Sequence, residues 1–189
     1  FSMEASGLQE ISNPAGLFLE ERSNDASGSV VCACLEGNRP ILVEVQALVA
    51  KTPYGMPRRT AVGFDYNRVT MLLAILERRL GMDFGAYDAY VNVVGGMRVT
   101  EPAADLAVAA ALVSSYRNRP IPHGVLVMGE VGLTGEVRRI GSPERRIKDA
   151  MNLGFKRFVL PMGKLSLDEP CNGVVQVKTL EEALDKVFA

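Results

Sequence analysis

The fold class is decided by the segment YVNVVGGMRVTEPAADLAVAAALVSS (90–115), which passes from a strand through a corner into a helix. Alternating side chains over 87–94 have the period of a β-strand, and Gly95-Gly96 follows as a flexible corner. The alanine-rich stretch 102–116 predicts a helix, because Pro102 suits a first helical position. Its small side chains predict very close packing against a sheet.

Strands and helices are also predicted on both sides of this segment. Before it, apolar periodicity predicts strands at 30–35, 41–50 and 59–64 and a helix at about 67–80. After it, the pattern predicts strands at 125–128, 137–140, 158–160 and 174–177, with helices at 142–153 and 180–188. The first two strands form a hairpin. Strands mixed with helices predict an α/β or α+β sandwich.

The length of 189 residues favours one domain. We expect it to cover 28–189, after a connecting segment 1–27 with turn signals at 13–14 and 23–25. The chain opens on Phe1 rather than Met, so we expect a fragment of a longer protein. It contains no apolar run of the ~20 residues that a membrane span needs, and no signal-peptide layout. We therefore expect no membrane contact.

The cysteines and the single histidine do not form a metal-binding pattern. Cys32 and Cys34 share one strand face, Cys171 is distant in sequence, and a zinc site needs four ligands. We expect buried structural thiols and, by default, a reducing cytoplasm. His123 sits between a proline-rich turn and a strand, where a surface or turn role is expected.

The net charge of −1 does not indicate nucleic-acid binding by the whole molecule, so such a role must depend on a local patch. Basic residues outnumber acidic ones between positions 138 and 157. An ordinary charged surface is one interpretation, and non-specific phosphate contact is the other. The candidate DNA-binding residues are Arg59, Arg145, Arg146 and Lys148.

Three segments carry a family resemblance: 90–115, GEVGLTGEVRRIGSPERRIKDAMNLGFKRFVLP (129–161) and TPYGMPRRTAVGFDYNRVTMLLAILERRLG (52–81). The chain resembles the Lon protease domain over nearly its whole length. The first and third segments are more specifically similar to the C-terminal Lon-like domain of a bacterial DNA-repair ATPase. This resemblance implies a ribosomal protein S5 domain 2-like fold.

The resemblance also implies a parent protein with a four-cysteine zinc finger and a RecA-like ATPase. ATP, Mg and Zn are then expected only in those missing domains, and no cofactor in this chain. The chain has no G-x-x-x-x-G-K-[ST] phosphate loop, and the nearest candidate is Gly163-Lys164. Such a parent would be a DNA-dependent ATPase and branch-migration helicase of recombinational repair. The implied partners are single-stranded or branched DNA, other copies in a homo-hexamer, and RecA recombinase.

Lon proteases use a serine in a Pro-Ser-Ala-Gly motif and a lysine base in a Gly-Gly-Leu-Lys-Glu-Lys motif. Matching these motifs to this chain places them on 102–105 and 141–146. Ala103 then stands at the nucleophile position and Arg146 at the base position. A methyl group cannot attack a carbonyl, and a guanidinium with a pKa above ~12 stays charged. The resemblance therefore implies a degenerate, non-proteolytic site.

Two alternatives remain open. Asp105 lies in the first turn of the predicted helix, where it either caps the helix or pairs with a basic residue such as Arg146 across the former cleft. A peptidase with a displaced nucleophile would have to use Ser114, Ser115 or Ser142.

Overall fold

The computed structural model describes residues 2–4, 7–9, 26–53, 55–167 and 171–189. Within these residues, seven strands form one sheet: β3 (Ser29–Glu36), β4 (Arg39–Lys51), β5 (Arg59–Val62), β6 (Tyr87–Val93), β7 (Val125–Val127), β10 (Arg157–Pro161) and β11 (Val174–Val177). The helices are α2 (Tyr66–Leu80), α3 (Asp105–Tyr116), α4 (Pro143–Asn152) and α5 (Leu180–Phe188), with short 3₁₀ turns η1 (Val94–Gly96) and η2 (Pro102–Ala104). Two small antiparallel pairs are β1 (Ser2–Glu4) with β2 (Gly7–Gln9), and β8 (Glu130–Val131) with β9 (Val137–Arg138). The turn signals at 13–14 and 23–25 lie outside the described residues.

The strand order across the sheet is β11-β10-β7-β3-β4-β6-β5. The predicted hairpin is confirmed, because β3 and β4 pair antiparallel, and β4 also pairs antiparallel with β6. All other neighbours in the sheet are parallel. Parallel neighbours need a crossover, which α2 supplies between β5 and β6 and α4 between β7 and β10. The sheet is therefore mixed but mostly parallel, and the fold is α/β as expected.

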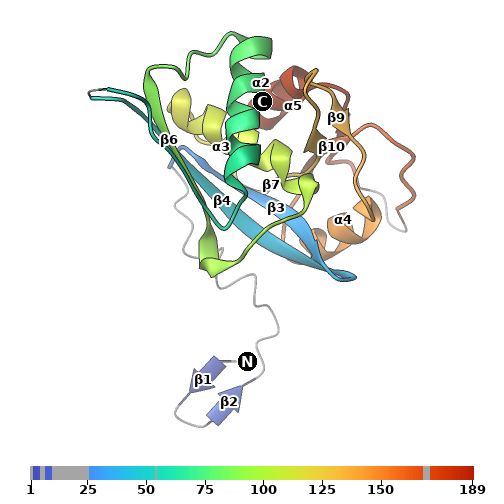
Figure 1. Ribbon diagram of the computed structural model, residues 1–189. Helices are drawn as coiled ribbons and strands as arrows, with labels where there is room; N and C mark the ends of the chain where they lie inside the picture. The colour runs from blue at the N-terminus through green and yellow to red at the C-terminus, as the bar shows by residue number, and fades with distance from the viewer. Residues whose placement is uncertain (1, 5–6, 10–25, 54, 168–170) are drawn as a thin grey trace.

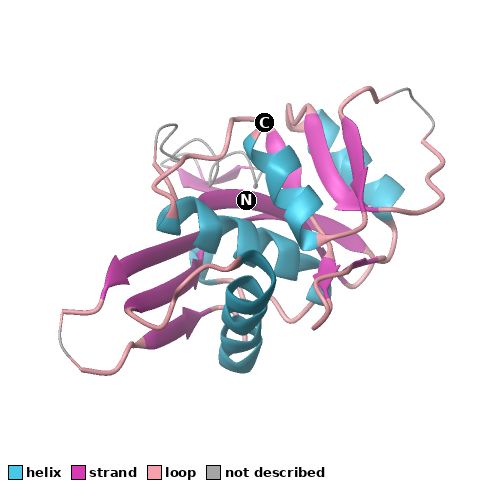
Figure 2. Cartoon of the chain, turned by 90° about the horizontal axis from the view of Figure 1, so that it is seen from above, coloured by secondary structure: helices cyan, strands magenta, loops and turns pink. Residues whose placement is uncertain are grey.

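Helices cover both faces of the sheet (Figure 1). Alternate residues of β3 point to opposite faces, so Cys32 belongs to the core that contains residues of α2, α3 and α5, whereas Val31 and Ala33 belong to the core that contains Ile147 of α4. Figure 2 shows the helices of the larger layer lying across the strands. The sheet thus separates a large core from a small one under α4.

Helix α3 is enclosed by the rest of the molecule, as its composition predicted. Its residues 105–114 are all buried. The helix begins as the 3₁₀ turn η2, where the Gly129 amide donates to the Ala103 carbonyl over 2.7 Å and the Leu106 amide donates to the Gly129 carbonyl over 3.0 Å. These bonds fix the start of α3 against the strand-turn segment that follows β7.

Side-chain caps are present at the starts of α2 and α5 but absent at the starts of η2, α3 and α4. In α2, the Asp65 side chain accepts from the Arg68 amide and Gly81 ends the helix with a φ of 64°. Ser142 precedes α4 with a φ of 51°, and its side chain makes no capping bond. Among the helices described, none is long and apolar enough to span a membrane.

Candidate functional site

The segment that carries one of the two positions matched to the protease dyad is tied to the residue at the other. Ala103, in η2, is 1% exposed, and Arg146, on the inner face of α4, is 0% exposed. Glu101, just before η2, connects them because its carboxylate forms an ion pair with Arg146. The position of the nucleophile and that of the base are therefore both occupied by buried groups.

Arg146 is held by partners from several segments. Its guanidinium donates to both Glu101 oxygens, to the Ala33 carbonyl over 2.6 Å and to the Gly141 carbonyl over 2.8 Å. Glu101 also accepts from the Leu35 amide over 2.8 Å. A planar fork of donors suits this arrangement and an ammonium does not. Arg146 is therefore an internal tie between α4, β3 and η2.

The expectation that Arg146 contacts DNA is wrong in this structure. Its side chain has no exposed surface, and its charge is already paired with Glu101. A phosphate would have to displace the half-buried Glu101 carboxylate to reach it. The cause is helical geometry, since Arg146 shares the inner face of α4 with Ile147 and Ala150.

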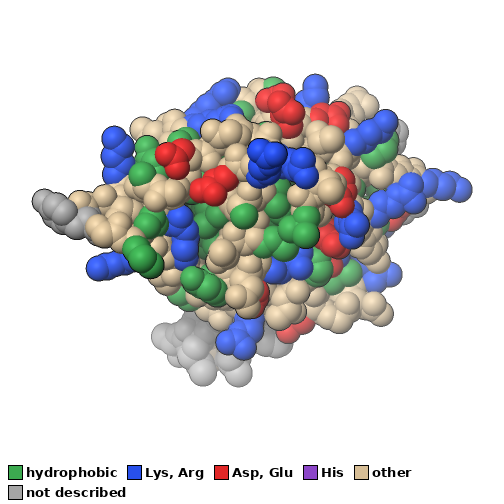
Figure 3. Space-filling model, turned by 45° about the horizontal axis from the view of Figure 1, so that its top comes forward, with side chains coloured by type: hydrophobic (Ala, Val, Ile, Leu, Met, Phe, Trp, Pro, Cys, Tyr) green, Lys and Arg blue, Asp and Glu red, His purple; other side chains and the backbone are tan. Residues whose placement is uncertain are grey.

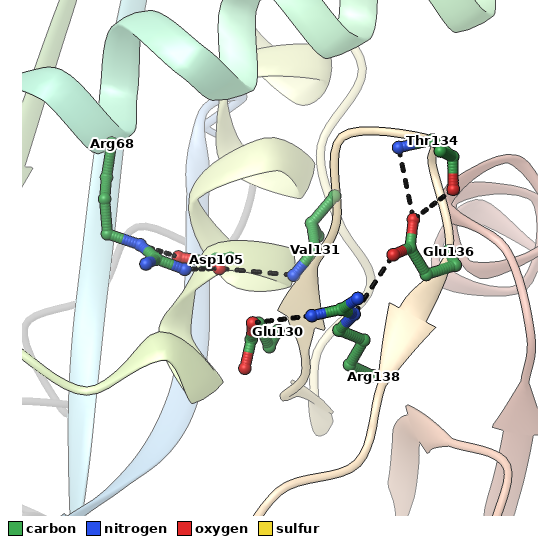
Figure 4. A network of polar contacts seen from close by, with 7 residues as sticks. All are labelled: Arg68, Asp105, Glu130, Val131, Thr134, Glu136 and Arg138. Carbon is green, nitrogen blue, oxygen red and sulfur yellow. Dashed lines mark hydrogen bonds and ion pairs between the residues drawn. The ribbon is translucent and has the colours of Figure 1, made fainter.

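Asp105 does pair with a basic residue, but its partner is Arg68 of α2 rather than Arg146 (Figure 4). Arg68 Nε donates to Asp105 Oδ1 over 2.7 Å, a second guanidinium nitrogen contacts Oδ2, and the Val131 amide donates to Oδ2 over 3.2 Å. Burial raises the pKa of Asp105, although Arg68 and the Val131 amide act in the opposite direction. The same hydrogen bond to Asp105 raises the pKa of Arg68.

A second set of charges lies beside this pair on the β8–β9 turn (Figure 4). Arg138 bonds to Glu136 over 3.0 Å and lies 3.8 Å from Glu130. Hydrogen bonds from Thr134 lower the pKa of Glu136. Because Arg138 is exposed and the two glutamates are only half-buried, these ion pairs contribute little to stability.

The cysteines behave as structural thiols. Cys32 and Cys34 are buried on one face of β3, with their sulfur atoms 3.5 Å apart. The hydrogen bond with Cys34, together with burial, raises the pKa of the Cys32 thiol well above its usual value. Cys171 is half-buried, and all three are free thiols. A raised pKa disfavours the thiolate, so Cys32 is not an activated nucleophile.

The serines of the displaced-nucleophile alternative do not lie in a catalytic arrangement. The buried Ser114 hydroxyl accepts from the Gly28 amide over 2.8 Å and donates to the Arg119 carbonyl over 2.6 Å. The Ser115 hydroxyl accepts from the Val49 amide over 2.9 Å. Both hydroxyls thus hold the backbone. Ser142 and the single histidine, His123, are exposed.

The remaining basic candidates differ from one another. Arg59 is half-buried and donates to the carbonyls of Phe84 and Tyr87, so it fixes a loop. Arg145 and Lys148 are exposed on the outer face of α4 and line one hollow of about 330 Å³. Elsewhere, on the face that Figure 3 shows, basic and acidic side chains are interspersed rather than gathered into one field.

The comparisons with known proteins place the chain in a family. A family model described as subunit ChlI of Mg-chelatase matches residues 45–164, more than half of the chain. The chain belongs to this family. Among the described residues, no group of three or more His, Cys, Asp or Glu side chains is placed to hold a metal ion.

Several curated relatives of the chain are DNA repair proteins. The chain is 48% identical to DNA repair protein RadA of Halalkalibacterium halodurans over 98% of its length, and 49% identical to RadA of Pseudomonas aeruginosa over 100%. RadA of Bacillus subtilis is 47% identical over 97% of the chain. The chain spans 41–42% of the length of these relatives. They confirm the resemblance to a bacterial DNA repair protein that segments 52–81 and 90–115 indicated.

Sequence reasoning missed Glu101 and Arg68, the partners of the buried Arg146 and Asp105. Neither Glu101 nor Arg68 was among the candidate site residues that the sequence indicated. The signal available for Glu101 was its place directly before the matched motif at 102–105. Nothing in the spacing singles out Arg68, because its contact with Asp105 depends on how α2 packs on α3.

Proposed function

We propose that the chain is a non-proteolytic, Lon-like scaffold and DNA-contacting domain of a RadA-type DNA-dependent ATPase. The identity to RadA over nearly the whole chain supports the assignment to DNA repair. The observation that supports a non-proteolytic role is the Arg146–Glu101 pair, because it puts a permanently charged, buried guanidinium where a protease would need a titratable base.

In this proposal the chain acts beside a zinc finger and a RecA-like ATPase, which bind Zn, ATP and Mg. It supports the assembly of a homo-hexameric ring on single-stranded or branched DNA during branch migration, with RecA recombinase as a further partner. The DNA contact lies on the outer face of α4, because Arg145 and Lys148 are both exposed there. Arg59 is left out because its guanidinium is engaged with backbone carbonyls.

Charge reversal at Arg145 and Lys148 is expected to weaken binding of single-stranded DNA at low salt. Loss of two phosphate contacts should also make the dependence of log K on log salt shallower by about 1.4. Fluorescence anisotropy with a labelled oligonucleotide measures both quantities. The matched control reverses Lys178 and Lys186, which are exposed elsewhere and change the net charge equally. Equal affinity loss in the two variants would remove α4 as the DNA contact.

Light scattering on the same samples tests the scaffold role. A ring platform predicts a mass well above that of one chain, unchanged by the charge reversals. A strict monomer at high concentration would contradict it for this chain.

Peptidase activity is expected to be absent. The chain, incubated with an unfolded protein and with a serine-directed covalent probe, should leave the substrate intact and carry no label by mass spectrometry. A labelled Ser114, Ser115 or Ser142 would instead establish the displaced-nucleophile alternative. Heat-unfolded chain serves as the control for non-specific labelling.

A further inference from the structure

The outer face of α4 borders a groove, which we call the α4 groove. It has a volume of about 330 Å³ and is lined by Glu144, Arg145, Lys148, Met151 and Asn152 of α4 and by Ser166 and Leu167 after β10. Its helical residues recur every three or four positions, so they form one stripe, while the opposite stripe is buried against the sheet. From residue 144 to residue 152 this stripe is about 12 Å long.

The rim of the groove carries positive charge in a defined orientation. Arg145 Nη1 donates to the Asn38 carbonyl over 2.9 Å, which fixes the guanidinium while leaving it exposed. A guanidinium has five N–H donors, so one such bond leaves others for a ligand. Lys148 lies one helical turn further along the same stripe and is also exposed. Together they suit an anionic group such as a phosphodiester.

The wall of the groove, unlike its basic rim, is apolar with an amide and a carboxylate beside it. Met151 and Leu167 are half-buried apolar side chains that face the groove from its two sides. Asn152 presents an exposed amide, and Glu144 is anchored by the Ser166 amide over 3.3 Å. The Glu144 carboxylate would repel a phosphate at this place, but it can accept hydrogen bonds from amino groups such as those on base edges. The Asn152 amide can both donate and accept hydrogen bonds.

We propose that the α4 groove binds one nucleotide of single-stranded DNA with its base unstacked. The phosphate lies on Arg145 and Lys148, the base lies between Met151 and Leu167, and the base edge faces Asn152 and Glu144. This inference rests on the proposed DNA contact and deepens it by specifying the form of DNA. A paired base would have to leave the duplex to enter, which costs a few kcal/mol. The groove therefore selects single strands.

The test compares a labelled single strand with an abasic strand of equal length, which has the same phosphates and no bases. The chain is expected to bind the base-bearing strand about tenfold more tightly than the abasic strand. This factor is near the lower end of what one stacked base contributes, because Met and Leu take the place of aromatic rings. Leu167→Ala should reduce this ratio to about twofold. The matched control is Leu165→Ala, an identical change at a half-buried residue of the same segment outside the groove, which should leave the ratio unchanged.

A double replacement, Arg145→Ala with Lys148→Ala, should weaken binding of both strands alike. Equal affinity of the unmodified chain for the two strands would overturn the nucleotide groove and leave the DNA contact standing. An equal effect of Leu165→Ala and Leu167→Ala would overturn the assignment to this groove. Absence of binding to either strand would instead remove the DNA contact itself. Urea unfolding of each variant verifies that all of them fold.

Discussion

Replacing Arg146 with methionine is expected to lower the free energy of unfolding by about 3 kcal/mol. The change removes the only cation that contacts Glu101 among the described residues, and it leaves the Ala33 and Gly141 carbonyls without their donors. Breaking a buried pair in this way costs about 3–5 kcal/mol. The lower end applies because the Glu101 side chain is 23% exposed and keeps some hydration. Urea unfolding followed by circular dichroism measures the loss.

Two controls separate the ion pair from other effects of this change. Arg145→Met makes the same replacement at the neighbouring, exposed position and should alter stability by about 0.5 kcal/mol or less. Adding Glu101→Gln to Arg146→Met removes the uncompensated charge, while the amide oxygen still accepts from Leu35. The double variant should therefore recover part of the loss. A single variant as stable as the parent chain would contradict the structural role of this pair.

Replacing Arg68 with methionine is expected to make stability depend more strongly on pH. Asp105 is fully buried, and burial already raises its pKa against the opposing effect of Arg68. Without Arg68, this folded-state pKa rises further above the unfolded value of about 3.9. A raised carboxyl pKa means that the folded state binds the proton more tightly. The stability that comes from this tighter proton binding by Asp105 is fully present below the unfolded-state pKa and is lost as the pH rises through the folded-state pKa.

The stability difference between Arg68→Met and the parent chain should therefore be small near pH 4 and grow to about 3–5 kcal/mol at pH 8. Chemical unfolding at several pH values measures it, and taking the difference cancels titrations common to both proteins. The control adds Asp105→Asn, which cannot ionise and should abolish the growth with pH. A difference that is constant across this range would exclude the ionisation of Asp105 as its cause.

Much of the fold could be predicted from local sequence signals. The apolar patterns at 30–35 and 41–50 predicted β3 and β4, and the periodicity at 67–80 predicted α2. These signals work because strand period and helix ends depend on a few neighbouring residues. The sheet order is different, since the places of β7 and β10 beside β3 follow from long-range packing that no local pattern records.

The candidate site was predictable only where a motif could be matched. The resemblance pointed to Ala103 and Arg146, and the structure places both beside Glu101. It did not reveal that Arg146 faces inward, because basic residues at 145, 146 and 148 of one helix cannot all point the same way. Of the two alternatives left open for Asp105, pairing with a basic residue is the one found, but with Arg68 instead of the suggested Arg146. Arg68 reaches it from α2, and the choice between two distant arginines depends on helix packing rather than on spacing.

Helix α3 has no side open to water along residues 105–114. The outward-facing residues of an ordinary surface helix can be substituted freely, but here every position from 105 to 114 is packed against other residues. Replacement of one of its alanines by a larger residue would force displacement of the sheet or of α2, so viable changes would have to arrive in compensating pairs. In a library of single substitutions, this helix should therefore tolerate the fewest replacements, even though its side chains are among the simplest in the chain.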